Sequence, residues 1–168
     1  IWTIATASGG ITGFDAAAFN LNTTTFSNAV GSGLFLIEQS GNDIRVRFGR
    51  APAIAAQPVH ATAECGTGSA LFTVSATGTA PLSYQWRHAG TNLPGATASA
   101  LAISPATSDT AGSYDVLVSN AYGSSPSAAA ILTVTDTTPP VFNCGQNETV
   151  TCMQGWGFTF PIITDNCD

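Results

Sequence analysis

The feature that most constrains the fold is the placement of two large aromatic residues between residues 82 and 122. Trp86 lies in the run Leu-Ser-Tyr-Gln-Trp-Arg, and Tyr114 ends the motif Asp109-Thr-Ala-Gly-Ser-Tyr. After Tyr114 the chain continues as Asp-Val-Leu-Val-Ser, with valine at every second position. A period of two is typical of strands that bury one face. The pattern predicts a two-sheet β-sandwich with Trp86 in its core and Tyr114 at the corner where the chain enters a central strand.

Composition narrows the class of protein. The 168 residues include 44% hydrophobic but only 8% charged residues, and the net charge is −6. There is no lysine, and the four arginines are Arg45, Arg47, Arg50 and Arg87. Nucleic acids and anionic lipids both require clustered cations, so we expect neither as a partner. No apolar run reaches the roughly 18 residues that a membrane-spanning helix needs, so no membrane insertion is expected. Such a Lys-free surface, rich in Ser, Thr, Ala and Gly, suits secreted bacterial β-proteins.

Residues 52–135 resemble the I-set-like immunoglobulin modules of bacterial secreted and cell-surface proteins, on the Trp86 and Tyr114 motifs. The resemblance implies an all-β immunoglobulin-like sandwich with strands over 52–58, 71–76, 82–87, 101–103, 113–120 and 129–135. Val74 and Val116 occupy the positions where many immunoglobulin domains place a disulfide between the sheets. The core is therefore expected to depend on burial around Trp86. The resemblance also implies that Asp109 holds the connection beside Tyr114.

The flanking regions are also expected to be β-structure. In residues 1–51, strands over 34–39 and 44–48 form a predicted hairpin, in which Arg45 and Arg47 give the second strand a basic outer face. This region loosely resembles autotransporter-associated β-strand repeats. Residues 136–168 begin with a proline-stiffened linker and resemble the start of a hyalin-repeat module. Three regions are thus predicted: 1–51, 52–135 and 136–168.

The cysteines are predicted to form disulfides, because an even number of cysteines fits an exported protein. Cys65, Cys144, Cys152 and Cys167 allow three pairings. Cys152 and Cys167 lie on successive strands of the hyalin-like segment and are expected to bond each other. Cys65 lies in the predicted turn before strand 71–76, at the end of the sandwich where strand 129–135 leaves toward Cys144, so a Cys65–Cys144 bond across the linker is also expected. The sequence contains no Cys-x-x-Cys motif, so a zinc site or a redox-active disulfide is not indicated.

For the residues that could act in catalysis, a structural role is the favoured interpretation. A nucleophilic cysteine would need an activating histidine, and His60 and His88 both fall at predicted strand edges or ends. The glutamates Glu38, Glu64 and Glu148 lie in three different regions, so a glycosidase-type carboxylate pair is not indicated. We therefore predict that the protein is not an enzyme.

A calcium site is the alternative interpretation of the acidic C-terminal residues. Asp165, Asn166 and Asp168, with Asp136 at the linker, carry the hard oxygen ligands that calcium prefers. An Asx-rich turn is the favoured interpretation. We accordingly expect no metal and no cofactor.

Aromatic residues raise the question of glycan binding. Trp156, flanked by glycines, and Tyr122 could stack on sugar rings, together with Trp2 and Phe158. Packing in the core or between modules is the favoured interpretation. The Trp156 and Tyr122 platform supports an alternative function, a carbohydrate-binding accessory module of a larger secreted enzyme.

The expected function is that of an extracellular structural or adhesive protein of the bacterial cell surface. Its expected partners are neighbouring modules of the same polypeptide or further copies of itself, with surface glycans as a further candidate. One hypothesis is that the strand Ile1–Ala7 completes a sheet in another copy and builds a fibre. The favoured alternative is that the chain is a piece of a longer multi-module protein.

Overall fold

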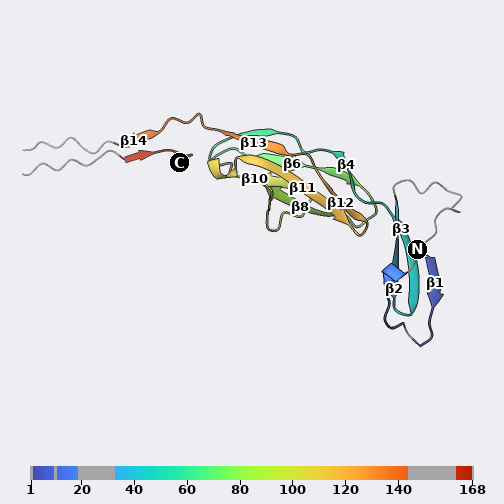
Figure 1. Cartoon of the computed structure of the whole chain (residues 1–168). Coiled ribbons are helices and arrows are strands. Elements are labelled where there is room, and N and C mark those ends of the chain that lie inside the picture. Colours follow the sequence, from blue (N-terminus) through green and yellow to red (C-terminus); the bar gives the residue numbers. More distant parts are fainter. Residues whose placement is uncertain (1, 10, 19–32, 144–161, 168) are drawn as a thin grey trace, which may run out of the picture.

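The computed structural model describes residues 2–9, 11–18, 33–143 and 162–167 (Figure 1). Within these residues the protein is all-β, as predicted, and its helical structure is limited to two 3-10 turns. These are η1 (Ala16–Ala18) and η2 (Ser108–Thr110). The strands fall into an N-terminal sheet, a central sandwich and a C-terminal hairpin, in chain order.

The central part is an immunoglobulin-like sandwich of two layers. One layer has the strand order β5-β13-β11-β8-β9, and the hairpin strand β12 also pairs with β11. The bounds of these strands are β5 Ala61–Glu64, β13 Ala130–Thr135, β11 Gly112–Asn120, β8 Ser83–His88, β9 Thr91–Asn92 and β12 Gly123–Pro126. The other layer pairs β10 (Ala100–Ile103) with β6 (Ala70–Thr73), and β4 (Ala53–Ala56) with β7 (Ser75–Thr77). These strands confirm the six strands predicted for this region.

Strand β5 is one of three strands of the sandwich that the sequence prediction missed, together with β9 and β12. It pairs with β13 in parallel, from Ala61 opposite Leu132 to Glu64 opposite Thr135. Its sequence, Ala-Thr-Ala-Glu, has no large apolar residue that would produce a period-two signal. The strand forms because β13 offers an unpaired edge, not because its own residues strongly favour extended structure.

The core surrounds Trp86 and takes side chains from both layers. Trp86, Phe72 and Val116 are fully buried, and Tyr114 is 2% exposed. The Phe72 ring lies 5.0 Å from the Tyr114 ring and 6.3 Å from the Trp86 ring, measured between centroids. The indole nitrogen of Trp86 donates a hydrogen bond to the Ala98 carbonyl at 2.9 Å. The core thus buries both the apolar surface and the polar atom of Trp86.

Two valines replace an inter-sheet disulfide, as predicted. Val74 is 7% exposed and Val116 is fully buried. Val74 separates β6 from β7, and its N–H donates to the Ser99 carbonyl at 2.9 Å, which extends the β6–β10 pairing by one residue.

Tyr114 forms the predicted tyrosine corner. Its hydroxyl donates to the Thr110 carbonyl in η2 at 2.7 Å. Burial raises the pKa of Tyr114 above its ordinary value. The expectation for Asp109 is wrong, because this residue is exposed and two threonines hold the turn. The Thr110 hydroxyl accepts the Thr107 N–H at 2.8 Å and donates to the Thr107 carbonyl at 2.9 Å.

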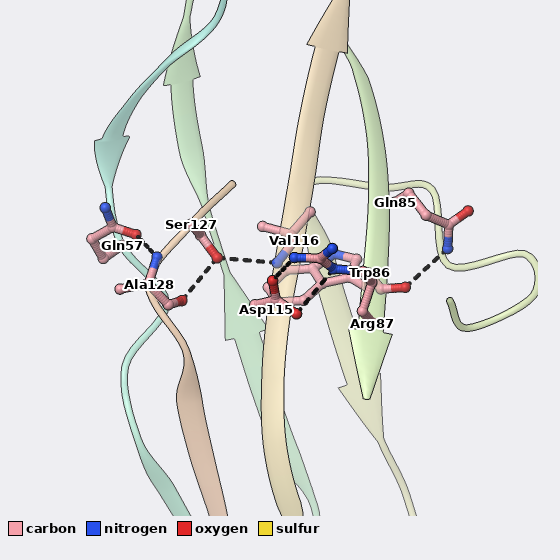
Figure 2. Close-up of polar contacts among 8 residues, drawn as sticks. All are labelled: Gln57, Gln85, Trp86, Arg87, Asp115, Val116, Ser127 and Ala128. Atoms are coloured by element: carbon pink, nitrogen blue, oxygen red, sulfur yellow. Dashed lines mark hydrogen bonds and ion pairs between the residues drawn. The ribbon is translucent and has the colours of Figure 1, made fainter. Parts of the chain in front are cut away.

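Polar side chains bridge gaps in the strand ladder around β11 (Figure 2). Ser127 lies between β12 and β13, and its hydroxyl accepts the Val116 N–H at 3.0 Å. The Ser127 N–H donates to the Val116 carbonyl at 2.9 Å, so both backbone polar groups of Val116 are hydrogen-bonded. Asp115, which precedes Val116 in β11, forms a two-point ion pair with Arg87 of β8. The Gln57 side chain accepts the Ala128 N–H at 2.8 Å and ties the end of β4 to the start of β13.

The N-terminal sheet has the order β1-β3-β2 and is antiparallel throughout. Strands β2 (Leu34–Ser40) and β3 (Asp43–Gly49) form the predicted hairpin. Strand β1 (Trp2–Thr6) pairs with β3, from Trp2 opposite Val46 to Thr6 opposite Asp43. The fibre hypothesis required this strand to be available to another copy. In the order β1-β3-β2 one edge of β1 is paired with β3 and β1 is the edge strand, so the fibre hypothesis stays a prediction.

The outer face of β3 is not a basic patch, contrary to the prediction. Arg45 forms an ion pair with Asp43 at 2.9 Å, and Arg47 forms one with Glu38 of β2 at 3.0 Å. The Arg47–Glu38 pair joins two strands, which the pattern of one strand did not reveal, whereas Asp43 and Arg45 lie two positions apart on β3 itself. The face is therefore close to neutral.

Candidate functional site

The structure places the notable side chains at the two ends of the sandwich, where it meets the flanking β-structure. At one end, Cys65 follows β5 and bonds Cys167, which follows the C-terminal hairpin of β14 (Val141–Asn143) and β15 (Ile162–Thr164). The expected Cys65–Cys144 and Cys152–Cys167 bonds are therefore wrong. The reason is geometric: β14 leaves the sandwich and the antiparallel β15 returns, which brings Cys167 back beside Cys65. Cys144 and Cys152 lie outside the described residues.

Hydrogen bonds reinforce this disulfide junction. The Asn166 side chain donates to the Cys65 carbonyl at 2.8 Å, and the Ser108 hydroxyl donates to the Cys167 carbonyl at 3.2 Å. Gly66 adopts φ +76° and approaches the Asn166 backbone so closely that a Cβ would lie 3.1 Å from its carbonyl oxygen. These contacts come from residues of three separate segments, so the junction is fixed by more than one bond.

The same residues settle the question of a C-terminal turn. The Asp165 carboxylate accepts the Cys167 N–H at 3.1 Å, which is the favoured Asx turn. Asn166 uses its side chain as a donor to Cys65, and Asp168 lies outside the described residues. In the described ranges, no group of three or more His, Cys, Asp or Glu residues is placed to hold a metal ion.

Glu64 ties the end of β5 to the linker that follows β13. Its carboxylate accepts the Thr137 N–H at 2.7 Å, the Thr137 hydroxyl at 2.9 Å and the Thr135 hydroxyl at 3.3 Å. The hydrogen bond from the Thr137 backbone, followed by that from its hydroxyl, lowers the pKa of Glu64 below its ordinary value. Charged Glu64 therefore holds the first residues of the linker against the sandwich.

This pKa shift predicts that acid loosens the linker. Because the folded-state pKa of Glu64 is lowered, its contribution is complete above the ordinary value of about 4.3 and is lost as pH falls through the folded-state pKa. We expect the Thr137 amide proton resonance to titrate below about pH 4.3 in the wild-type chain. In Glu64→Gln that titration should vanish. An unchanged titration in Glu64→Gln would assign it to another carboxylate.

At the opposite end, a second junction joins the sandwich to the N-terminal sheet. The Asn120 side chain donates to the carbonyls of Arg50 and Thr79, each at 2.8 Å. The Thr79 hydroxyl accepts the Arg50 N–H at 2.8 Å. The Asn120 carboxamide oxygen also accepts the Tyr122 N–H at 2.8 Å, which fixes the turn that carries the Tyr122 ring. Sequence reasoning missed Asn120 because it has the form of an ordinary turn residue.

Tyr122 belongs to this junction and is not an open platform for a sugar ring. It is 9% exposed, and a Cβ on Gly49 would lie 2.3 Å from two of its ring atoms. Tyr122 and Phe48 line a pocket of about 270 Å³ between the two parts, together with Arg47, Thr79, Ala80, Pro81 and Ala121. The geometry fits the packing interpretation of Tyr122. Trp156 lies outside the described residues.

Gly49 should therefore be intolerant of any side chain. Gly49→Ala is expected to displace the Tyr122 ring and expose the chain between β3 and β4, because the new methyl group meets both this ring and the Thr79 hydroxyl. Limited proteolysis should cut this segment several-fold faster than in the wild type. Gly9→Ala is the matched control, since a Cβ at Gly9 meets nothing within 4 Å. Equal cleavage rates in the two variants would contradict the proposed packing.

The residues considered for catalysis lie apart and have structural partners. Nδ1 of His60 accepts the Ile131 N–H at 2.8 Å, and His88 stacks on Tyr114 at 4.5 Å. Glu38 is paired with Arg47 and Glu64 with the linker, whereas Glu148 lies outside the described residues. Among the described residues, no cysteine thiol is free to act with either histidine, because Cys65 and Cys167 are bonded.

Comparisons with known proteins give the following similarities. No protein-family model matches the chain, and no curated protein matches it. Among solved structures, the tandem immunoglobulin repeats of Dlar align over 51% of this chain and 48% of that chain, at 23% identity and a TM-score of 0.46. Sidekick-1 immunoglobulin domains 1–4 align over 56% and 26%, at 24% identity and a TM-score of 0.48. An I-band fragment of titin aligns over 56% and 35%, at 29% identity and a TM-score of 0.47.

The chain thus spans about half or less of these three solved chains. All three are immunoglobulin-repeat structures, but the assignment of an immunoglobulin-like fold depends on the chain's own strand order, Trp86 core and Tyr114 corner. In the part of the chain that the structure describes, no helix has the length and apolarity to cross a bilayer.

Proposed function

We propose that this chain is part of an extracellular structural or adhesive protein of the bacterial cell surface, in which the sandwich acts as a spacer between further β-modules. The single observation that carries the proposal is that both ends of the sandwich hold the adjoining segments with dedicated side chains. Asn120 and Tyr122 do so at one end. Cys65, bonded to Cys167, and Glu64 do so at the other. A spacer needs such fixed junctions, because modules joined by free linkers reorient independently.

The disulfide supports an exported location, since such bonds persist mainly outside the reducing cytosol. The low number of charged side chains, with the described cations of β3 and β8 already paired, gives the surface little means of recognising a charged ligand. We infer that the principal partners are the neighbouring modules of the same polypeptide. The division into regions 1–51, 52–135 and 136–168 is part of this proposal.

Immunogold labelling tests the location. An antibody raised against the 168-residue chain should label the outside of intact cells that encode it. Antibody against a cytosolic enzyme, applied to the same cells, controls for leakage. Labelling that appears only after permeabilisation would overturn the proposal.

A further inference from the structure

The Cys65–Cys167 disulfide connects two positions that are far apart in the sequence, which affects how the chain responds to a pulling force. It joins two residues separated by 102 positions, whose Cα atoms lie 5.6 Å apart. Cys65 directly follows β5, and Cys167 comes three residues after the end of β15. Every strand from β6 to β15 therefore lies inside one covalently closed loop, while β1 to β5 lie outside it.

We propose that this disulfide is a covalent bypass for tension, so that a pulling force passes from Cys65 to Cys167 through two sulfur atoms and does not extend the strands from β6 to β15 that lie between them. Force applied along the backbone from the N-terminal side reaches Cys65, passes to Cys167 and continues into whatever follows. The residues between them lie off this path, because the bond closes the loop at its base. A fully stretched chain then leaves the loop unextended even if the sandwich inside it unfolds.

The amount of chain that is shielded follows from backbone geometry. A peptide extends by at most about 3.3–3.6 Å per residue, so a separation of 102 positions corresponds to roughly 350 Å of extended chain. The disulfide replaces this length with the 5.6 Å that separates the two Cα atoms. Without it, the chain between the two cysteines would extend once noncovalent strand pairings such as β5–β13 gave way.

The noncovalent contacts at the junction fit this role. The bonds from Asn166 to the Cys65 carbonyl and from Ser108 to the Cys167 carbonyl hold both backbones beside the bond. Glu64 anchors the linker next to it. The base of the loop is therefore held by side-chain hydrogen bonds as well as by the disulfide.

The bypass leaves only the segments outside the loop extensible. Strand β4 is held by β7, with Ala53 opposite Thr77, and β5 is held by the parallel β13. These two strands can peel away under load, and the N-terminal sheet can open. We expect a short, limited extension followed by a stiff covalent limit. This inference concerns the mechanics of the chain and does not depend on the cell-surface location proposed above.

Stretching single molecules tests the inference. The full 168-residue chain is held by handles at its two ends in optical tweezers and pulled under non-reducing conditions. The wild type should reach its limit at roughly 230 Å, the length of the residues outside the loop, whereas Cys65→Ser with Cys167→Ser should reach roughly 590 Å. The double variant Cys144→Ser with Cys152→Ser is the matched control and should stop at the wild-type limit.

The readout is the final length of the stretched chain, so it holds even if a variant fails to fold. A wild-type limit near 590 Å would overturn the proposal, as would a short limit that disappears in the Cys144 and Cys152 double variant. Non-reducing peptide mapping of the same sample should find the Cys65 and Cys167 peptides linked. Linkage of either cysteine to another partner would equally overturn it. Failure of the immunogold labelling would leave all of these outcomes unchanged.

Discussion

Trp86→Ala is expected to destabilise the sandwich by about 3–5 kcal/mol, the usual cost of removing a large buried aromatic side chain. The Trp86 side chain is fully buried between the two layers and lies against the Phe72 ring. Its removal also leaves the Ala98 carbonyl without the indole donor. Domains of this size are stable by about 5–15 kcal/mol, so this variant should lose a large part of its stability or fail to fold. Urea unfolding followed by circular dichroism measures the change.

Two control variants test whether the loss of stability in Trp86→Ala comes from the burial of Trp86. Leu71→Ala removes an apolar side chain from neighbouring strand β6, but Leu71 is 62% exposed, so a change within about 0.5 kcal/mol is expected. Trp86→Phe keeps a buried ring and loses the hydrogen bond to Ala98, so its cost should lie between the other two. If Trp86→Ala behaved like Leu71→Ala, the core would not be organised around this residue.

Much of the fold could be predicted because large apolar residues at every second position indicate which face of a strand is buried. Trp86, Tyr114 and the valines of β11 have side chains whose placement depends mainly on local alternation and on the need to be covered. The β2–β3 hairpin was predictable from local sequence as well, since β2 begins with an apolar run, β3 alternates and a short turn joins them. The location of these elements needed no knowledge of distant residues.

The features that were missed depend on distant parts of the chain. Strand β5 pairs with an edge of β13, and one edge of β1 pairs with β3. Asn120 reaches the Arg50 carbonyl across 70 positions of sequence, and nothing in its own neighbourhood indicates that partner. The ion pair between Arg47 of β3 and Glu38 of β2 likewise depends on strand register. Such contacts require the topology, which a one-dimensional pattern leaves open.

The disulfide was the most consequential pairing error, because nearest-partner reasoning favours bonds between adjacent strands. The hairpin of β14 and β15 reverses the chain direction and carries Cys167 back to the end of β5. The bond therefore closes a loop around most of the sandwich and not a small loop within the C-terminal region. This changes the expected energetic effect, since a longer loop restricts the unfolded chain more strongly.

Cys65→Ser with Cys167→Ser is accordingly expected to lower the free energy of unfolding substantially. The chain-entropy relation gives about 4.7 kcal/mol for a loop near 100 residues, and measured effects are typically about 2–4 kcal/mol. The polar contacts of Asn166 and Ser108 remain in the variant, so the folded junction should persist while the unfolded chain gains freedom. The loss therefore acts mainly through the unfolded state, which distinguishes it from the Trp86 variant.

Urea unfolding of the same set of variants makes this distinction measurable. The double variant should shift the midpoint to lower urea and raise the slope of unfolding free energy against urea, because an unclosed chain exposes more surface when unfolded. Trp86→Ala should shift the midpoint with little change of slope. Cys144→Ser with Cys152→Ser keeps the long loop closed and should retain the wild-type slope. A wild-type slope and midpoint in the Cys65 and Cys167 double variant would mean that no covalent loop encloses the sandwich.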